Sequence, residues 1–193
     1  ITVNNFTVNG AGDTGLYIDN TDGTGTVTIQ NGDFSNNAGM GVGVRSNNDI
    51  LLSNVTASNN PGGFALGQGA FLDTSSGTGD IILTGTNEFN NNAADGLFAY
   101  SADDISLHNV TANQNGAYGA YLESCGCTAD SHIVLTGFNV FNDNDLMGLS
   151  AFTDGNITIS NVTANGNDDT GANLYATGNI VVNGTNEFNN NDR

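Results

Sequence analysis

Side chains that could support acid–base, metal or nucleophilic chemistry are mostly acidic in this sequence. The chain has 20 Asp and Glu, two His, two Cys, and only Arg45 and Arg193 as cationic side chains. Adjacent acids occur at Asp103-Asp104 and Asp168-Asp169, both in predicted turns. Glycoside hydrolysis needs two carboxyl groups at a set separation across a groove, and these pairs form no distinctive motif for it. We therefore predict that the protein is not an enzyme and uses no cofactor.

Metal binding has weak support in the sequence. Residues 19–23 and 167–171 are Asp- and Gly-rich and faintly similar to calcium loops, but neither has the full series of oxygen ligands with a closing Glu. Cys125 and Cys127 lie in one loop as Cys-Gly-Cys. They could be exposed thiols, a strained local disulfide, or half of a metal site, which is the weakest alternative. We predict no metal site, and we expect His108 and His132 at the surface.

A repeat of about two dozen residues positions all of these side chains. Its first part is a glycine followed by two aliphatic or small residues that flank one variable position. This phrase begins at Gly15, Gly41, Gly69, Gly96, Gly119, Gly148 and Gly171. A unit of this size cannot bury its own apolar face, so the units must stack on one another as a solenoid.

The second part of the repeat is a pair of aliphatic residues separated by one position. The pairs begin at Ile1, Val27, Ile50, Ile81, Ile105, Ile133, Ile157 and Ile180. This period of two is typical of a strand with one buried face. Each pair leads into a bend and another short strand, which alternates between two types. One type is Asn-Val-Thr-Ala, as at Asn54, and the other is Gly-x-Asn-x-Phe, as at Gly85. The alternation predicts a double coil, in which Val and Ala fill one layer and Phe fills the next.

Asparagines follow these strands in nearly every unit. They include Asn59, Asn60, Asn91, Asn92, Asn115, Asn144, Asn167 and Asn191. Inward Asn side chains stacked at the strand spacing can form a ladder of amide hydrogen bonds. The glycine after each Asn turn is expected to supply a backbone with positive φ.

The Asn-bearing turns together with the Gly-aliphatic-x-aliphatic strands resemble the right-handed parallel β-helix repeat proteins, a class that includes pectate lyases, polygalacturonases and surface adhesins. The resemblance covers the whole chain and implies an all-β solenoid of about eight coils, each with about 24 residues and three short strands. This solenoid is expected to form one domain over residues 1–193. Pectate-lyase-like members use an Arg or Lys base, usually with Ca²⁺, and polygalacturonase-like members use an Asp cluster with a His and a basic pair. The chain has no Lys and only two Arg, so it has few of the basic residues that either mechanism requires.

Aromatic residues mark the strand that follows each glycine. With the aliphatic residues pointing inward, the outward positions hold Tyr17, Phe71, Phe98, Tyr100, Tyr121, Phe152 and Tyr175. Stacking of the coils brings these residues together as a strip on one sheet face. A contiguous apolar strip on a surface is typical of a contact site. We predict that polysaccharide or another copy of the chain binds there; the alternative is that loops cover the strip as part of the core.

Composition limits the partners further. The formal net charge is −18, so the chain lacks the basic surface that nucleic acid or an anionic membrane would need. No apolar run is long enough for a membrane span, and there is no signal peptide or initiator Met, so we expect a processed product or a segment of a longer chain. Six sequons, at Asn5, Asn54, Asn109, Asn156, Asn161 and Asn183, could accept glycans, but most coincide with the repeat's own Asn and Thr positions.

We predict a non-enzymatic extracellular structural protein, filament-forming or adhesive, at a cell surface. The alternative is a carbohydrate-binding or polysaccharide-degrading β-helix module. Ice binding is disfavoured because Asp33, Asn87, Asn139 and Asn186 interrupt the row of Thr residues. The first and last coils have no capping segment, and the last coil lacks its glycine strand. We therefore expect either a segment cut from a longer helix or, as the favoured alternative, head-to-tail self-association along the solenoid axis. Other cell-surface chains are also expected as partners.

Overall fold

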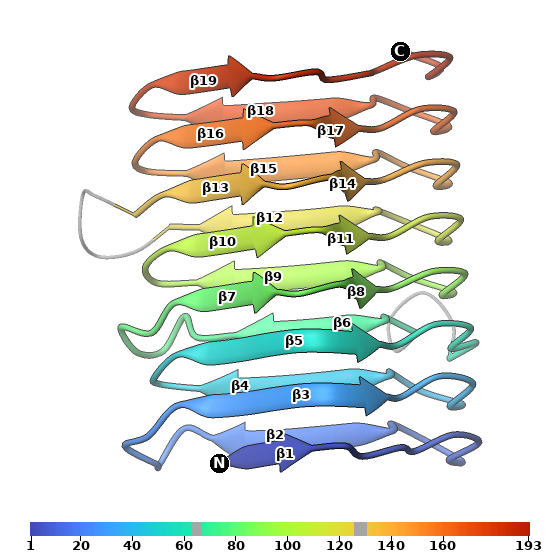
Figure 1. The fold of residues 1–193 in the computed structure, drawn as a ribbon, viewed down its shortest axis with the longest axis vertical. Coiled ribbons are helices and arrows are strands. Elements are labelled where there is room, and N and C mark those ends of the chain that lie inside the picture. The colour runs from blue at the N-terminus through green and yellow to red at the C-terminus, as the bar shows by residue number, and fades with distance from the viewer. Residues whose placement is uncertain (63–66, 126–130) are drawn as a thin grey trace.

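Short β-strands wind around one axis and stack in parallel, as Figure 1 shows. The computed structural model describes residues 1–62, 67–125 and 131–193, and these residues contain strands but no helix. Every strand pairing among the described residues is parallel. The result is an all-β solenoid of about seven turns with roughly 26 residues per turn. The eight aliphatic pairs of the sequence lie on successive rungs, and they delimit these seven turns.

Two sheets form the walls of the solenoid, rather than three separate ones. The twelve-stranded sheet contains β1 (Thr2–Asn4), β3 (Val27–Asp33), β5 (Ile50–Thr56), β7 (Ile81–Thr84), β8 (Asn87–Glu88), β10 (Ile105–His108), β11 (Val110–Thr111), β13 (Ile133–Thr136), β14 (Asn139–Val140), β16 (Ile157–Ser160), β17 (Val162–Thr163) and β19 (Ile180–Asn183). The seven-stranded sheet contains β2 (Leu16–Asn20), β4 (Val42–Ser46), β6 (Ala70–Asp73), β9 (Leu97–Ser101), β12 (Ala120–Ser124), β15 (Leu149–Thr153) and β18 (Ala172–Ala176). The two short strands predicted for the first half of each coil share one sheet, and in β3 and β5 they are continuous.

The core lies between the two sheets and follows the predicted period of two. Ile105 and Leu107 of β10 are fully buried, as are Leu97 and Ala99 of β9 on the opposite wall. The register places identical side-chain positions above one another, so that Ile105 pairs with Ile81 and Ile133. Each coil therefore buries its apolar face against the neighbouring coils as well as across the core.

Reciprocal asparagines explain why two types of coil alternate. The Asn54 Oδ1 accepts the Thr86 N–H at 3.1 Å, and the Asn87 Oδ1 of the next coil accepts the Val55 N–H at 3.1 Å. Gly85 fits between them because a Cβ there would lie 2.4 Å from the Asn54 Oδ1. The same exchange recurs between Asn109 and Asn139 and between Asn161 and Asn186. The double coil is thus a hydrogen-bonding unit as well as a packing unit.

The predicted Asn ladder is present and runs through the solenoid. Its members are Asn37, Asn60, Asn92, Asn115, Asn144, Asn167 and Asn191. From Asn60 onward, each Asn donates both its backbone N–H and its side-chain N–H to the Oδ1 of the next member, as Asn115 does to Asn144 at 3.0 Å each. The predicted members Asn59 and Asn91 are not in the ladder. They are exposed and have φ values of 59° and 56°, because they form the turn itself.

The repeat glycines are required for space and not for a positive φ, contrary to the expectation from sequence. A Cβ on Gly69 would lie 2.6 Å from the Gly96 carbonyl oxygen and 2.7 Å from the Asn92 Nδ2. Backbone and ladder therefore approach each other too closely for any side chain at this position. The Thr row of the twelve-stranded sheet also differs in detail: Glu88 and Val140, not Asn87 and Asn139, stand in register with Thr111. Asn87 and Asn139 are buried.

Candidate functional site

Outward side chains of the seven-stranded sheet form two parallel rows along the solenoid axis. The first row is Tyr17, Gly43, Phe71, Phe98, Tyr121, Ser150 and Asn173. The second row is Asp19, Arg45, Asp73, Tyr100, Glu123, Phe152 and Tyr175. Successive members of a row come from hydrogen-bonded strands, so they lie about 4.8 Å apart along the axis.

The aromatic strip follows the first row and then crosses to the second. Phe71 stacks on Phe98 with ring centroids 5.4 Å apart and planes 11° apart, and Phe98 stacks on Tyr121 at 5.0 Å and 9°. Because Ser150 follows Tyr121 in the first row, the strip continues through Phe152 at 5.9 Å. It ends at Tyr175, 6.3 Å from Phe152. We call these five rings, Phe71, Phe98, Tyr121, Phe152 and Tyr175, the aromatic ridge.

Two predicted members of the strip stand apart from the ridge. Tyr17 is separated from Phe71 by Gly43, and a Cβ on Gly43 would lie 3.0 Å from the Tyr17 ring. Tyr100 lies in the second row, where Glu123 separates it from Phe152. A ring outside the prediction, Tyr118, contacts Tyr121 at 5.5 Å. It precedes a repeat glycine, outside the period-two pattern of the strand, so no sequence signal placed it there.

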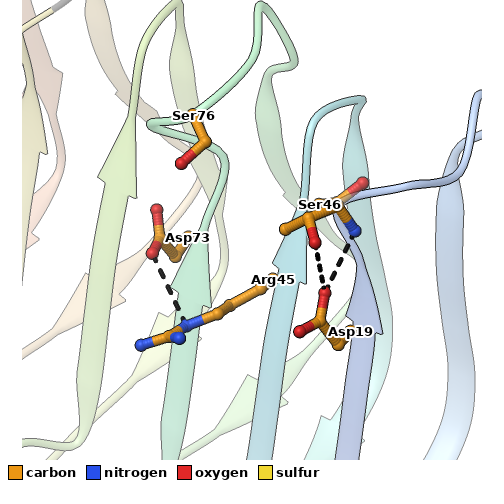
Figure 2. Close-up of a pocket in the computed structure, with 6 residues that line it drawn as sticks. Asp19, Arg45, Ser46, Asp73 and Ser76 are labelled. Carbon is orange, nitrogen blue, oxygen red and sulfur yellow. Dashed lines mark hydrogen bonds and ion pairs between the residues drawn. The ribbon is translucent and has the colours of Figure 1, made fainter.

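Arg45 extends the ridge at its N-terminal end. Its guanidinium carbon lies 5.9 Å from the centre of the Phe71 ring, and its Nε lies 3.8 Å from the Asp73 Oδ2. Asp19 and Asp73 flank it in register on β2 and β6. The three side chains line a pocket of about 160 Å³ that Figure 2 shows.

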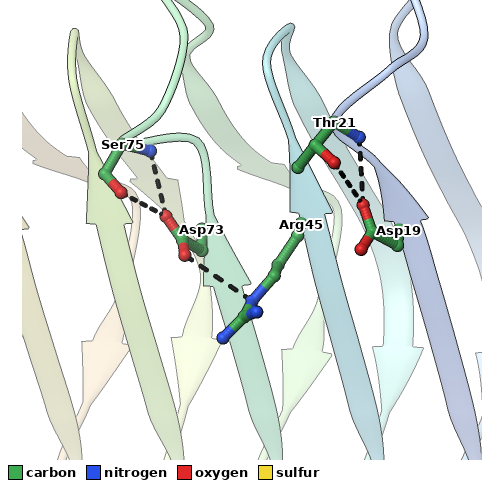
Figure 3. A network of polar contacts seen from close by, with 5 residues as sticks. All are labelled: Asp19, Thr21, Arg45, Asp73 and Ser75. Carbon is green, nitrogen blue, oxygen red and sulfur yellow. Dashed lines mark hydrogen bonds and ion pairs between the residues drawn. The ribbon is translucent and has the colours of Figure 1, made fainter.

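The two carboxylates beside Arg45 accept the same pair of hydrogen bonds from the turns that follow them, as Figure 3 shows. The Asp19 Oδ1 accepts the Thr21 N–H at 3.1 Å and the Thr21 hydroxyl at 2.7 Å. The Asp73 Oδ1 accepts the Ser75 N–H at 3.0 Å and the Ser75 hydroxyl at 2.6 Å. The hydrogen bonds from Thr21 lower the pKa of Asp19, so this carboxylate is ionised at neutral pH.

Further along the ridge, Glu123 affects two neighbouring groups, the Tyr121 hydroxyl and the Cys125 thiol. The Tyr121 hydroxyl donates to the Glu123 Oε2 at 2.9 Å. Burial raises the pKa of Tyr121, and this hydrogen bond raises it further. Burial and the nearby charges of Glu123 and Asp154 also raise the pKa of the Cys125 thiol, which makes it a weak nucleophile at neutral pH. Cys127, the second member of the Cys-Gly-Cys motif, lies outside the described residues.

The adjacent acids of the sequence have different surroundings. Asp103 and Asp104 lie with Asp80 at the turns between the two sheets, and one carboxylate oxygen from each lies within 4.8 Å of the others. Burial raises the pKa of Asp80, and the charges of Asp103 and Asp104 add to the shift. Asp168 is exposed, and Asp169 forms an ion pair with the Arg193 Nε at 3.6 Å.

These turns carry a ladder that the sequence did not reveal. The Asp80 Oδ1 accepts the Asp104 N–H at 3.1 Å, and the Asp104 Oδ1 accepts the His132 N–H at 2.7 Å. The His132 Nδ1 in turn accepts the Asn156 N–H at 3.0 Å. His132 is therefore a half-buried member of a structural ladder and not a surface residue, whereas His108 is exposed as expected. The backbone hydrogen bonds to the Asp80 and Asp104 carboxylates give these acids a structural role in the turns.

Comparison with known proteins agrees with this architecture. No curated protein and no solved structure matches the chain. The described residues include no helix long and apolar enough to cross a membrane. Residues 1–130 match the family model described as right handed beta helix region. Together with the parallel solenoid described above, this match shows that the chain belongs to the right-handed β-helix family.

Proposed function

We propose that the protein is a non-catalytic, adhesive β-solenoid that acts outside the cell, at a cell surface. The observation that supports this proposal is the aromatic ridge: five rings from five successive strands form one continuous surface feature. Tyr175 is 61% exposed, and the four other rings are half-buried. A contiguous row of partly exposed rings on one sheet face is typical of a contact site.

The surroundings of the ridge favour binding over catalysis. A lyase-type mechanism would need a basic side chain free to take a proton, and Arg45 is instead held by Phe71 and Asp73. The Cys125 thiol near the ridge has a raised pKa, which disfavours nucleophilic attack. We therefore expect incubation with polygalacturonate and Ca²⁺ to release neither unsaturated ends nor reducing sugar. Clear turnover would contradict the non-catalytic part of the proposal.

The adhesive part is tested by removing rings from the outer surface without touching the core. The double variant Phe98→Ser, Tyr100→Ser removes one ring of the ridge and the outward ring beside it on β9. It should keep the far-UV circular dichroism of the wild type, because both side chains point outward. It should weaken association at least tenfold with one or more of four matrices: cellulose, chitin, basic peptide beads and beads carrying the protein itself. Phe138→Ser is the matched control, because Phe138 is 74% exposed but precedes β14 in the other sheet. Association that is equal for all three proteins would contradict an adhesive ridge.

Polysaccharide binding is a second candidate at one end of the ridge. The Phe152 and Tyr175 planes are tilted by 41°, and Tyr175 is largely exposed, so a ring face is open for a sugar. Phe71, Phe98 and Tyr121 instead stack on one another and turn much of their faces to neighbouring rings.

Filament formation along the solenoid axis stays a prediction, and electron microscopy at high protein concentration tests it.

A further inference from the structure

Three strands of the seven-stranded sheet carry the same pair of outward side chains. An aromatic residue is followed two positions later by a carboxylate in Tyr17/Asp19 of β2, Phe71/Asp73 of β6 and Tyr121/Glu123 of β12. We call these the aromatic–acid pairs. A separation of two residues puts both side chains on the same face of a strand. The pairs alternate with β4 and β9, so consecutive pairs are two strands apart.

One of these pairs already holds a cation from the chain itself. Arg45 reaches from β4 over the Phe71 ring at 5.9 Å, and its Nε lies 3.8 Å from the Asp73 Oδ2. An aromatic ring face and a carboxylate are the two groups that a guanidinium binds best. The Arg45 side chain is 51% exposed, so a group arriving from solvent could replace it. Figure 3 shows the ion pair between Arg45 and Asp73 beside Asp19, whose carboxylate accepts the same two hydrogen bonds from its turn as that of Asp73.

Charge selects the kind of partner that this face can accept. The net charge is −18, and Asp19, Asp73 and Glu123 stand in the second row beside the rings. An acidic polysaccharide or a second copy of this chain would meet repulsion there, whereas a basic partner would be attracted. The chemistry of the occupied pair, a guanidinium on a ring and a carboxylate, favours arginine side chains over other cations.

The spacing of the pairs selects the conformation of the partner. Two steps of about 4.8 Å separate consecutive pairs by about 9.6 Å along the axis. A polyproline II segment rises about 3.1 Å per residue and places every third side chain on one face, about 9.3 Å apart. We propose that the seven-stranded sheet binds an extended, arginine-containing polypeptide in this conformation, with its guanidinium groups against the carboxylates of the aromatic–acid pairs and Arg45 occupying the Phe71/Asp73 pair as an internal competitor. This inference rests on the adhesive function proposed above and names its partner.

The first experiment measures binding of a fluorescein-labelled peptide of four Arg-Pro-Pro repeats by fluorescence anisotropy. Glu123→Gln should weaken binding about tenfold, because it removes the charge of one pair and retains an acceptor for the Tyr121 hydroxyl. Glu88→Gln is the matched control: it removes the same charge from an exposed position on β8 of the twelve-stranded sheet. It should change binding less than twofold. Equal losses in the two variants would reduce the effect to general charge attraction and overturn the proposal.

The second experiment tests Arg45 as the internal competitor. Arg45→Ala should tighten binding of the same peptide at least threefold, because it frees the Phe71/Asp73 pair. Arg193→Ala removes the same charge near Asp169 and should tighten it less than twofold. Equal effects would contradict the competitor role.

A third measurement tests the spacing. A second peptide has the same composition as the repeat peptide but carries its four arginines side by side, between two runs of four prolines. Without the three-residue repeat, it should bind at least fivefold more weakly. Equal affinity would overturn the proposed register. One combined outcome separates the two proposals. If the double variant Phe98→Ser, Tyr100→Ser loses adhesion to cellulose or chitin, and Glu123→Gln leaves peptide binding unchanged, the adhesive function stands and the arginine-containing partner is wrong.

Discussion

Asp95 is a half-buried carboxylate at the turn before β9, and it shows how one residue can lower the stability of this acidic protein. Its Oδ1 accepts the Tyr118 N–H at 3.1 Å. Burial nevertheless raises the pKa of Asp95 in the folded state, because the hydrogen bonds offset only part of the desolvation. A raised pKa in the folded state means that ionisation destabilises the fold, and this cost is present above the folded pKa. It disappears as pH falls below the unfolded pKa, where both states are protonated.

Asp95→Asn should therefore stabilise the protein at pH 7, since an amide oxygen can still accept from Tyr118 and carries no charge. Urea unfolding followed by circular dichroism should show a higher midpoint at pH 7 and a shrinking advantage as pH falls toward 4. Asp168→Asn is the control, because it removes one negative charge from an exposed turn. A gain of the same size from Asp168→Asn would assign the effect to net charge and contradict the role of burial.

Two asparagine ladders with different burial connect the elements on one side of the solenoid. The inner ladder contains Asn144, which is 1% exposed. A second, half-buried ladder passes two residues away: the Asn113 Oδ1 accepts the Asn142 N–H at 2.7 Å, and the Asn142 Oδ1 accepts the Asn165 N–H at 2.8 Å. Each buried donor left without a partner costs about 1–3 kcal/mol. Donors that can reach water cost less.

Asn144→Ala should lower the free energy of unfolding by about 3 kcal/mol, because it strands the backbone and side-chain N–H groups of Asn115 in the interior. Asn142→Ala should cost about 1 kcal/mol, because the freed Asn165 N–H lies in a half-buried turn. Thermal unfolding of the two variants beside the wild type measures both values. Equal losses would mean that burial does not decide the strength of the ladder.

Period and position allow the elements to be predicted from sequence, whereas register decides their contacts. The inward Ile105 and Leu107 and the ladder residue Asn144 follow from the repeat alone. Asn59 and Asn60 look equivalent in sequence, and only the turn conformation separates the φ of 59° at Asn59 from the buried Asn60.

The aromatic strip was predicted as a set of outward residues, but its path was not. The path depends on which residue stands beside which on neighbouring strands. Ser150 pairs with Tyr121 and turns the ridge toward Phe152. Arg45 meets Phe71 and Asp73 only because β4 and β6 are neighbours in this register. Coil lengths that vary from 23 to 31 residues hide such pairings from a reading of the sequence.

The whole molecule concentrates its negative charge on a narrow rod, and this sets how its stability responds to salt. Eighteen net negative charges are carried by 193 residues, and acids recur at the same positions on neighbouring coils, as Asp49, Asp80 and Asp104 do. Two like charges about 10 Å apart in water repel by about 0.4 kcal/mol, and many such pairs add up along the solenoid. Unfolding spreads the same charges over a larger volume, so the repulsion acts mainly against the folded state.

Raising NaCl from 10 to 500 mM should therefore raise the thermal unfolding midpoint, because the Debye length falls from about 30 Å to below about 8 Å over this range. A variant with four exposed acids replaced, Asp13→Asn, Asp22→Asn, Asp168→Asn and Asp192→Asn, should unfold at a higher temperature in 10 mM salt. Its midpoint should also rise less with added salt, since fewer charges remain to be screened. Circular dichroism at 218 nm during heating measures all four midpoints. A wild-type midpoint that is independent of salt, or that falls with added salt, would contradict the prediction that repulsion among the 18 net negative charges lowers the stability of the folded state.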